Sequence, residues 1–106
     1  MAHSSASKAR TRISPDFRLN LEGVFAPRTS LRHTNLARAS LRGGDFRYVD
    51  FTGANMKDAI LEGTKLQGAI LTDVVNLTWK QLSQAEIDES TVLPDYLSAA
   101  DREARS

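Results

Sequence analysis

The sequence predicts an all-β solenoid in which the chain winds as a four-sided parallel β-helix. Two observations predict this fold. A large apolar residue returns at every fifth position from Leu31 to Leu71, nine times without a break. A small or β-branched residue stands two positions before each of these nine residues. Neither the helical period of 3.6 residues nor the strand period of 2 explains a strict period of five.

The geometry of a short extended segment explains this spacing. A bulky and a small residue separated by two positions lie on the same side of such a segment, so both can face one interior. Four segments joined by tight turns close a square of twenty residues, and the next coil stacks about 4.8 Å above it. Less regular units extend the register back to Leu19. The eleven fives of residues 19–73 therefore predict about 2.75 coils.

Residues twenty positions apart should stack in columns, and the outward columns support this register. Opposite charges meet in several of them: Glu22, Arg42 and Glu62 share one column, Arg38 lies under Asp58, and Asp45 lies under Lys65. Asn35 under Asn55 predicts a ladder of side-chain amides. Three glycines fall at one corner, as turns with unusual backbone angles require: Gly23, Gly43 and Gly63. Phe46 and Phe51 should stack across the interior.

The units ANMKD at 54–58 and TNLAR at 34–38 resemble the pentapeptide-repeat family, whose motif is Ala, then Asp or Asn, then Leu and two variable residues. The resemblance covers about half of the chain and implies a right-handed β-helix. The segment 76–97 is also similar to tails that follow such repeats in bacterial proteins. Some family members resemble a DNA duplex in size and charge, and inhibit or protect DNA gyrase in that way.

Four parts are expected along the chain. Residues 1–14 form a polar, basic and disordered arm, 15–75 the β-helix, 76–97 a C-terminal cap and 98–106 a frayed tail. Thr78 and Gln81 have the spacing of a helix capping box, which predicts a short capping α-helix over about 79–88 that covers the last coil. At the opposite end, Ile13, Phe17 and Leu19 are candidates for a lid.

Composition and motifs argue against an enzyme. The chain has no cysteine, which excludes disulfides and thiolate chemistry and fits a cytoplasmic location. Neither His3 nor His33 has neighbouring ligands, no serine is paired with a base, and the carboxylates are spread around the solenoid. No apolar run approaches the roughly 20 residues of a membrane span. We therefore expect no catalytic residue, cofactor or metal.

Two sets of residues form a candidate interaction surface. The first is a basic cluster, consistent with nine Lys/Arg against three Asp/Glu up to Tyr48: Arg28, Arg32, Arg38, Arg42 and Arg47, with Tyr48 beside them. It could bind nucleic acid or an anionic surface. We favour the alternative that these are the ordinary polar positions of a repeat. The second set is Ile60, Ile70 and Trp79, which the C-terminal segment should cover unless they form an oligomer contact.

The leading hypothesis is a structural and protein-interaction module, or scaffold, that presents rigid faces to a protein partner or to a second copy in a homodimer. Binding to nucleic acid or an anionic surface through the basic N-terminal half is an alternative. DNA mimicry that modulates a topoisomerase such as gyrase is less favoured. The repeat from Thr29 to Asp73 carries six basic and five acidic residues, whereas such mimicry requires a strongly acidic rod.

Overall fold

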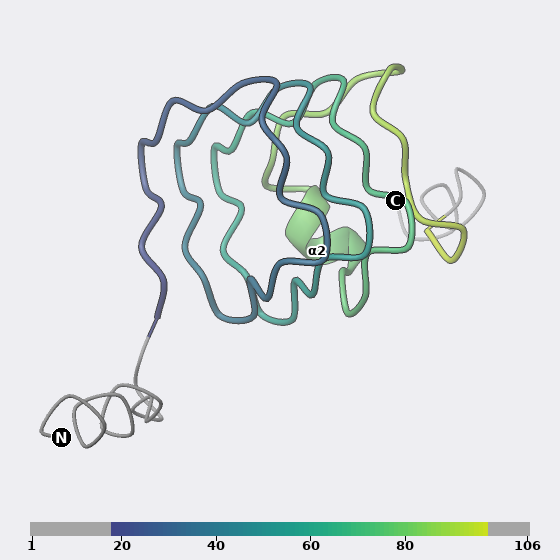
Figure 1. Ribbon diagram of the computed structural model, residues 1–106, viewed down its shortest axis with the longest axis horizontal. Helices are drawn as coiled ribbons and strands as arrows, with labels where there is room; N and C mark the ends of the chain where they lie inside the picture. The colour runs from purple at the N-terminus through teal and green to yellow at the C-terminus, as the bar shows by residue number, and fades with distance from the viewer. Residues whose placement is uncertain (1–17, 98–106) are drawn as a thin grey trace, which may run out of the picture.

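The computed structural model describes residues 18–97, which wind into a stack of square coils (Figure 1). Parallel β-bridges join residues twenty positions apart on each of the four sides, as the sequence predicts. We name the sides by their outward residues: side A is Asn20, Ser40 and Ile60; side B is Phe25, Asp45 and Lys65; side C is Ser30, Asp50 and Ile70; side D is Asn35, Asn55 and Val75.

The interior consists of the predicted columns. Leu41 and Leu61 lie one above the other and are 0% and 1% exposed. Phe46 and Phe51 meet in the middle of one coil, with ring centroids 6.1 Å apart and planes tilted by 55°. Burial of each such side chain stabilises the fold by about 1.5–3 kcal/mol. Each period of five therefore places one large and one small residue in the interior.

From Leu31 to Leu71 each corner is closed by a main-chain hydrogen bond, in which the N–H three residues after a central residue donates to its carbonyl, at 2.9–3.3 Å. Some outward residues add a side-chain bond to the same turn. The side-chain oxygens of Asn20 and Asp50 accept from the main-chain N–H two residues later, at 2.9 and 3.0 Å. Asn35 and Asn55 do the same at 3.1 Å. Among the described residues no side-chain hydrogen bond joins Asn35 to Asn55, so the predicted amide ladder between them is wrong. The Asn55 oxygen accepts instead from the side-chain amide of Asn76, at 3.0 Å, in addition to its turn bond.

The predicted charge columns are formed only in part. Arg42 and Glu62 make an ion pair at 3.1 Å, as expected. The carboxylate of Asp45 instead pairs with Arg47 of its own coil, at 2.8 Å, although Lys65 is its bridge partner above. A bidentate arginine two residues away is geometrically better placed than a lysine on the next coil.

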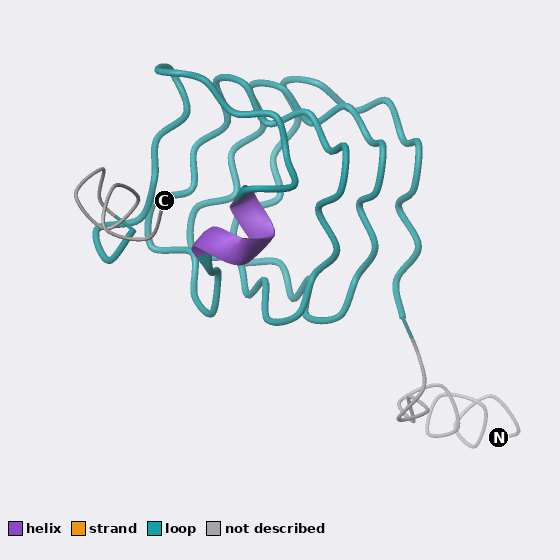
Figure 2. Ribbon diagram, turned by 180° about the vertical axis from the view of Figure 1, so that it is seen from behind, coloured by secondary structure: helices purple, strands orange, loops and turns teal. Residues whose placement is uncertain are grey.

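The only helix among the described residues is α2, Trp79–Leu82, shown in Figure 2. The capping box is present, because the Thr78 hydroxyl accepts from the Gln81 N–H and the Gln81 side chain accepts from the Thr78 N–H. The predicted end near residue 88 is wrong. Glu86 returns to the ladder as the bridge partner of Lys65, because the open edge of the last coil needs hydrogen-bond partners that a helix would not supply.

The stacked backbone extends beyond the repeat recognised in the sequence. Val75, the last residue of the predicted β-helix, pairs with Asn55, although the last complete five ends at Asp73. Further on, Val92 pairs with Ile70 on side C. The register is lost at Asn76, which adopts φ 65° and leaves the buried position to Leu77.

The upper edge of the last coil is closed in two ways. On sides B and C, the main chain of Glu86 and Val92 supplies the hydrogen bonds, at 2.7–2.9 Å. On side D, the Tyr96 hydroxyl accepts from the Leu77 N–H and donates to the Val74 carbonyl, both at 3.0 Å. On side A, the Gln81 amide donates to the Ala59 carbonyl at 2.9 Å. On sides D and A, side-chain groups thus supply the hydrogen bonds that the main chain supplies on sides B and C.

The first coil is less completely buried than the others. Leu19, Leu21, Val24, Ala26 and Leu31 pack against the core but keep part of their surface exposed. Two of the residues expected to form a lid, Ile13 and Phe17, lie outside the described residues. Leu19, the third, is partly buried as the first residue of the coil.

Candidate interaction surface

The five arginines of the basic cluster lie at all four corners of the solenoid. Arg42 follows side A, Arg28 and Arg47 follow side B, Arg32 follows side C, and Arg38 follows side D. A nucleic-acid site requires several cations on one face. The fold instead distributes these five arginines, which are close in sequence, over four different corners.

Acidic partners offset much of this positive charge. Arg32 pairs with Asp50 at 3.0 Å, in addition to the Arg42–Glu62 and Arg47–Asp45 pairs. The hydroxyl and N–H of Thr52, together with Arg32, lower the pKa of Asp50 to about 2. The hydrogen bond from Arg47 likewise lowers the pKa of Asp45. Exposed pairs of this kind contribute little to stability, but they reduce the local potential.

Tyr48 is held by its neighbours in the coils below and above. The Arg28 guanidinium lies 4.5 Å from the centroid of the Tyr48 ring. The edge of the ring lies against Gly68, where an added Cβ would be 2.3 Å from two ring carbons. The side chain is still 49% exposed, but an arginine already occupies one face of the ring.

Ile60 and Ile70 remain exposed, at 39% and 37%. The expectation that the C-terminal segment covers them is therefore wrong. Its residues stack on the edge of the last coil, above these side chains, and not against the outer wall. Trp79 behaves differently: it is 9% exposed and belongs to the core cluster, so it is part of the cap and not of the surface.

Sequence reasoning missed four further exposed apolar residues: Phe25, Val75, Val92 and Tyr96, which are 74%, 46%, 47% and 48% exposed. Val75 could have been found by extending the interval of twenty from Asn55. The sequence gives no such indication that Val92 and Tyr96 are exposed, because both residues follow the end of the repeat. Ile70 and Val92 are bridge partners, and the Tyr96 hydroxyl binds the carbonyl next to Val75. Apolar side chains thus gather at the upper end of sides C and D.

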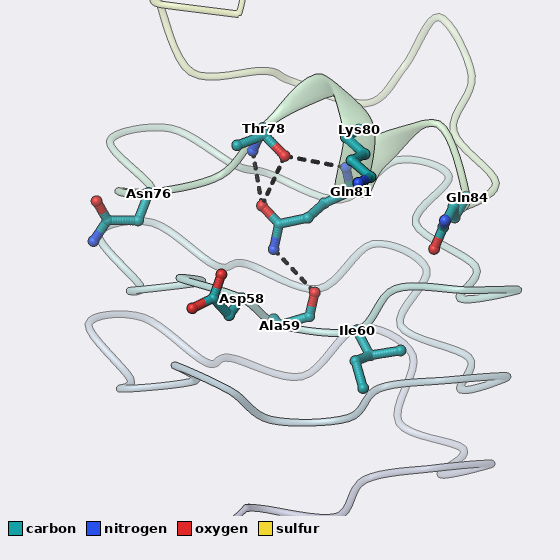
Figure 3. Close-up of a pocket in the computed structure, with 8 residues that line it drawn as sticks. All are labelled: Asp58, Ala59, Ile60, Asn76, Thr78, Lys80, Gln81 and Gln84. Carbon is teal, nitrogen blue, oxygen red and sulfur yellow. Dashed lines mark hydrogen bonds between the residues drawn. The ribbon is translucent and has the colours of Figure 1, made fainter.

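A groove of about 420 Å³ lies on side A, between α2 and the wall of the last coil (Figure 3). The side chain of Gln81 crosses it and donates to the carbonyls of Met56 and Ala59, at 2.8 and 2.9 Å. Asp58 and Ile60 lie along the wall below, and Lys80 lies on the helix above. Its lining is a mixture of amide, charged and apolar groups.

Within residues 18–97, no three His, Asp or Glu side chains come together as a metal site would require. His33 stands at a corner, with its ring against Gly53. None of the described helices has the length and hydrophobicity needed to cross a bilayer.

The family model for pentapeptide repeats matches residues 18–53 and 34–73, with eight copies of the repeat. These residues make up more than half of the chain. The chain belongs to the pentapeptide-repeat family. Proteins of this family are generally non-catalytic. No curated protein matches the chain.

Two solved structures are similar to this member of the family. One is the pentapeptide repeat protein Rfr23 from the cyanobacterium Cyanothece 51142, at 38% identity and a TM-score of 0.64, over 70% of this chain and 50% of that chain. The other is QnrB1, a plasmid-mediated fluoroquinolone resistance protein, at 16% identity and a TM-score of 0.65, over 81% and 39%. The chain thus spans half or less of either structure, and the likeness to QnrB1 shows the fold alone.

Proposed function

We propose that this pentapeptide-repeat protein is a non-enzymatic module that binds a partner protein through the exposed apolar side chains of its last coil. One observation carries the proposal. Three of the four outward residues of that coil are Ile60, Ile70 and Val75, whereas the coil below has Ser40, Asp50 and Asn55 at the same positions. Exposed apolar side chains on an otherwise polar wall are typical of a protein contact.

The charge distribution favours a protein over nucleic acid. The arginines point to four corners, and three of them are paired with carboxylates. Electrostatic binding to a phosphate backbone would require them to be free and on one face. An acidic surface that imitates DNA is equally disfavoured by the balance of charge in the repeat.

Affinity capture from the source cell tests the proposal, with the double variant Ile70→Thr/Val75→Thr as the informative bait. Threonine has nearly the shape of valine but removes apolar surface at both wall positions. The matched control is Ser30→Thr, which changes an outward residue of side C in the first coil. We expect the native chain and the control to retain one stoichiometric protein at low and high salt, and the double variant to lose it.

Two results of this experiment would contradict the proposal. Recovery of nucleic acid without a stoichiometric protein, with its loss at high salt, would contradict the proposal and favour an electrostatic role. Equal capture by the native chain and by Ile70→Thr/Val75→Thr would show that the apolar wall is not the contact.

A further inference from the structure

The tripeptide Ala-Ile-Leu occurs twice on the upper edge of the last coil, at 59–61 on side A and at 69–71 on side C. On side C this edge is paired with residues 91–93, Thr-Val-Leu. The Val92 N–H donates to the Ala69 carbonyl at 2.9 Å, and the Leu71 N–H donates to the Val92 carbonyl at 2.7 Å. The sequence Ala-Ile-Leu in this position therefore accepts a parallel strand.

On side A the same edge has no strand. The Gln81 amide supplies a donor to the Ala59 carbonyl, in place of the N–H that Val92 gives to Ala69. The other half of the pairing is unmet: among the described residues, the Leu61 N–H has no acceptor. Leu61 is 1% exposed, and a buried N–H without an acceptor is rare because it costs about as much as a lost hydrogen bond.

The three equivalent donors of the stack show what Leu61 lacks. The N–H groups of Met56, Leu66 and Leu71 donate to the carbonyls of Val75, Glu86 and Val92, at 3.0, 2.8 and 2.7 Å. Each of these acceptors is a main-chain carbonyl of an extended segment on the coil above. The geometry at Leu61 is thus suited to a peptide carbonyl.

The groove beside this edge provides room for such a segment. Its volume, about 420 Å³, lies in the range of roughly 300–1,000 Å³ that is typical of ligand sites. Ile60 projects from the wall and is 39% exposed, as an apolar contact for a bound side chain. Asp58 and Lys80 stand below and above the groove with opposite charges (Figure 3).

We infer that this groove binds an extended peptide segment of a partner protein, which pairs with residues 59–61 as residues 91–93 pair with 69–71. The peptide accepts from the Leu61 N–H and donates one N–H to the Ala59 carbonyl, while Gln81 keeps its bond to the Met56 carbonyl. Addition of a strand to a free edge is a common mode of peptide recognition. A β-branched apolar residue at the pairing position, as Val92 is on side C, fits the pleated edge.

This inference rests on the proposed function and names one docking site and the chemistry of its occupant. The test is a titration of the ¹⁵N-labelled full chain with the acetylated and amidated peptide Ser-Thr-Val-Leu-Pro, which copies residues 90–94. We expect the amide resonances of Ile60 and Leu61 to shift, and hydrogen exchange at Leu61 to slow by roughly tenfold or more at saturation. The control peptide has proline in place of valine and so lacks the N–H for Ala59; it should cause no shift.

A matched pair of variants locates the site. Ile60→Thr changes the groove and should weaken peptide binding by at least roughly fivefold, the scale of a lost apolar contact. Ile70→Thr makes the same change on side C and should leave the affinity unchanged. Both residues are more than a third exposed, so neither variant should impair folding.

Two outcomes would overturn the inference. Shifts centred on Leu71 would show that the peptide replaces the chain's own residues 91–93, and that side A is not the site. The absence of shifts at millimolar peptide would remove the groove as a strand site. Neither outcome bears on the partner captured through Ile70 and Val75, so failure of this inference and failure of the proposed function remain distinguishable.

Discussion

Gly43 and Gly68 occupy equivalent turns but have different surroundings, which makes them a matched pair for substitution by alanine. Their φ angles are 68° and 73°, in the left-handed region that side chains rarely adopt. A Cβ at Gly43 would have no atom within 4 Å, whereas a Cβ at Gly68 would lie 2.3 Å from two carbons of the Tyr48 ring. Alanine at Gly43 therefore measures backbone strain alone, and alanine at Gly68 adds the displacement of Tyr48.

The expected magnitudes follow from these contacts. Left-handed strain costs about 1–2 kcal/mol, and the lower entropy of the unfolded chain offsets about 0.4–1 kcal/mol of it. We expect Gly43→Ala to lower the free energy of unfolding by about 1 kcal/mol. Gly68→Ala should also disrupt the Arg28–Tyr48 contact, worth about 0.5–1 kcal/mol when exposed, and some apolar burial of the half-exposed ring. Its total cost should be about 2–3 kcal/mol.

Urea unfolding monitored by circular dichroism measures both variants, and a double-mutant cycle with Tyr48→Ala assigns the difference. In the Tyr48→Ala background, Gly68→Ala should cost no more than Gly43→Ala. The melting temperature should shift in parallel, by about 4–8 °C for each kcal/mol. Equal costs of Gly43→Ala and Gly68→Ala in the otherwise native chain would refute the packing of Tyr48 against the last coil.

Three other variants test the cap and the corners by the same unfolding assay. Tyr96→Phe should cost about 1–3 kcal/mol, because it leaves the Leu77 N–H without its acceptor; no loss would mean that the hydroxyl is dispensable. Gln81→Leu should cost a similar amount, because two main-chain carbonyls lose their donor, and a neutral effect would contradict that role. The Asp50 pKa is lowered from 3.8 to about 2, so its charge stabilises the fold fully above about pH 4. This contribution is lost as the pH falls to about 2, and Asp50→Asn should therefore flatten the decline in melting temperature over that window; an unchanged slope would contradict the assignment.

The columns could be predicted from the sequence because the spacing that creates them is local. One large and one small buried residue per five specify the side, and the interval of twenty specifies the stack, so the position of Leu41 under Leu61 followed directly. The end of α2 could not be predicted in this way. The capping box at Thr78 marks where the helix begins, but its end after Leu82 is set by the unpaired edge of the last coil, which draws Glu86 into the ladder.

The groove was beyond sequence reasoning for a related physical reason. Its unmet donor at Leu61 exists because the chain leaves the square at Asn76 and returns only at Gln84, whose carbonyl accepts from Gly63. That excursion depends on tertiary pairing and not on any local pattern. Ile60 was noticed in the sequence as an outward apolar residue, but the groove beside it depends on the position of α2.

The apolar residues of the last coil cannot all face one flat partner. Ile60 lies on side A, opposite side C, whereas Ile70, Val92 and Val75 lie on the adjoining sides C and D. In the coils below, Asn and Asp at many of these positions bind the turn that follows, and this local bond is given up at Ile60, Ile70 and Val75. Loss of a favourable local interaction on separate sides of one coil favours two contacts over one. Ile60→Thr and Ile70→Thr should therefore weaken different interactions, and a single partner lost equally with either variant would contradict that division.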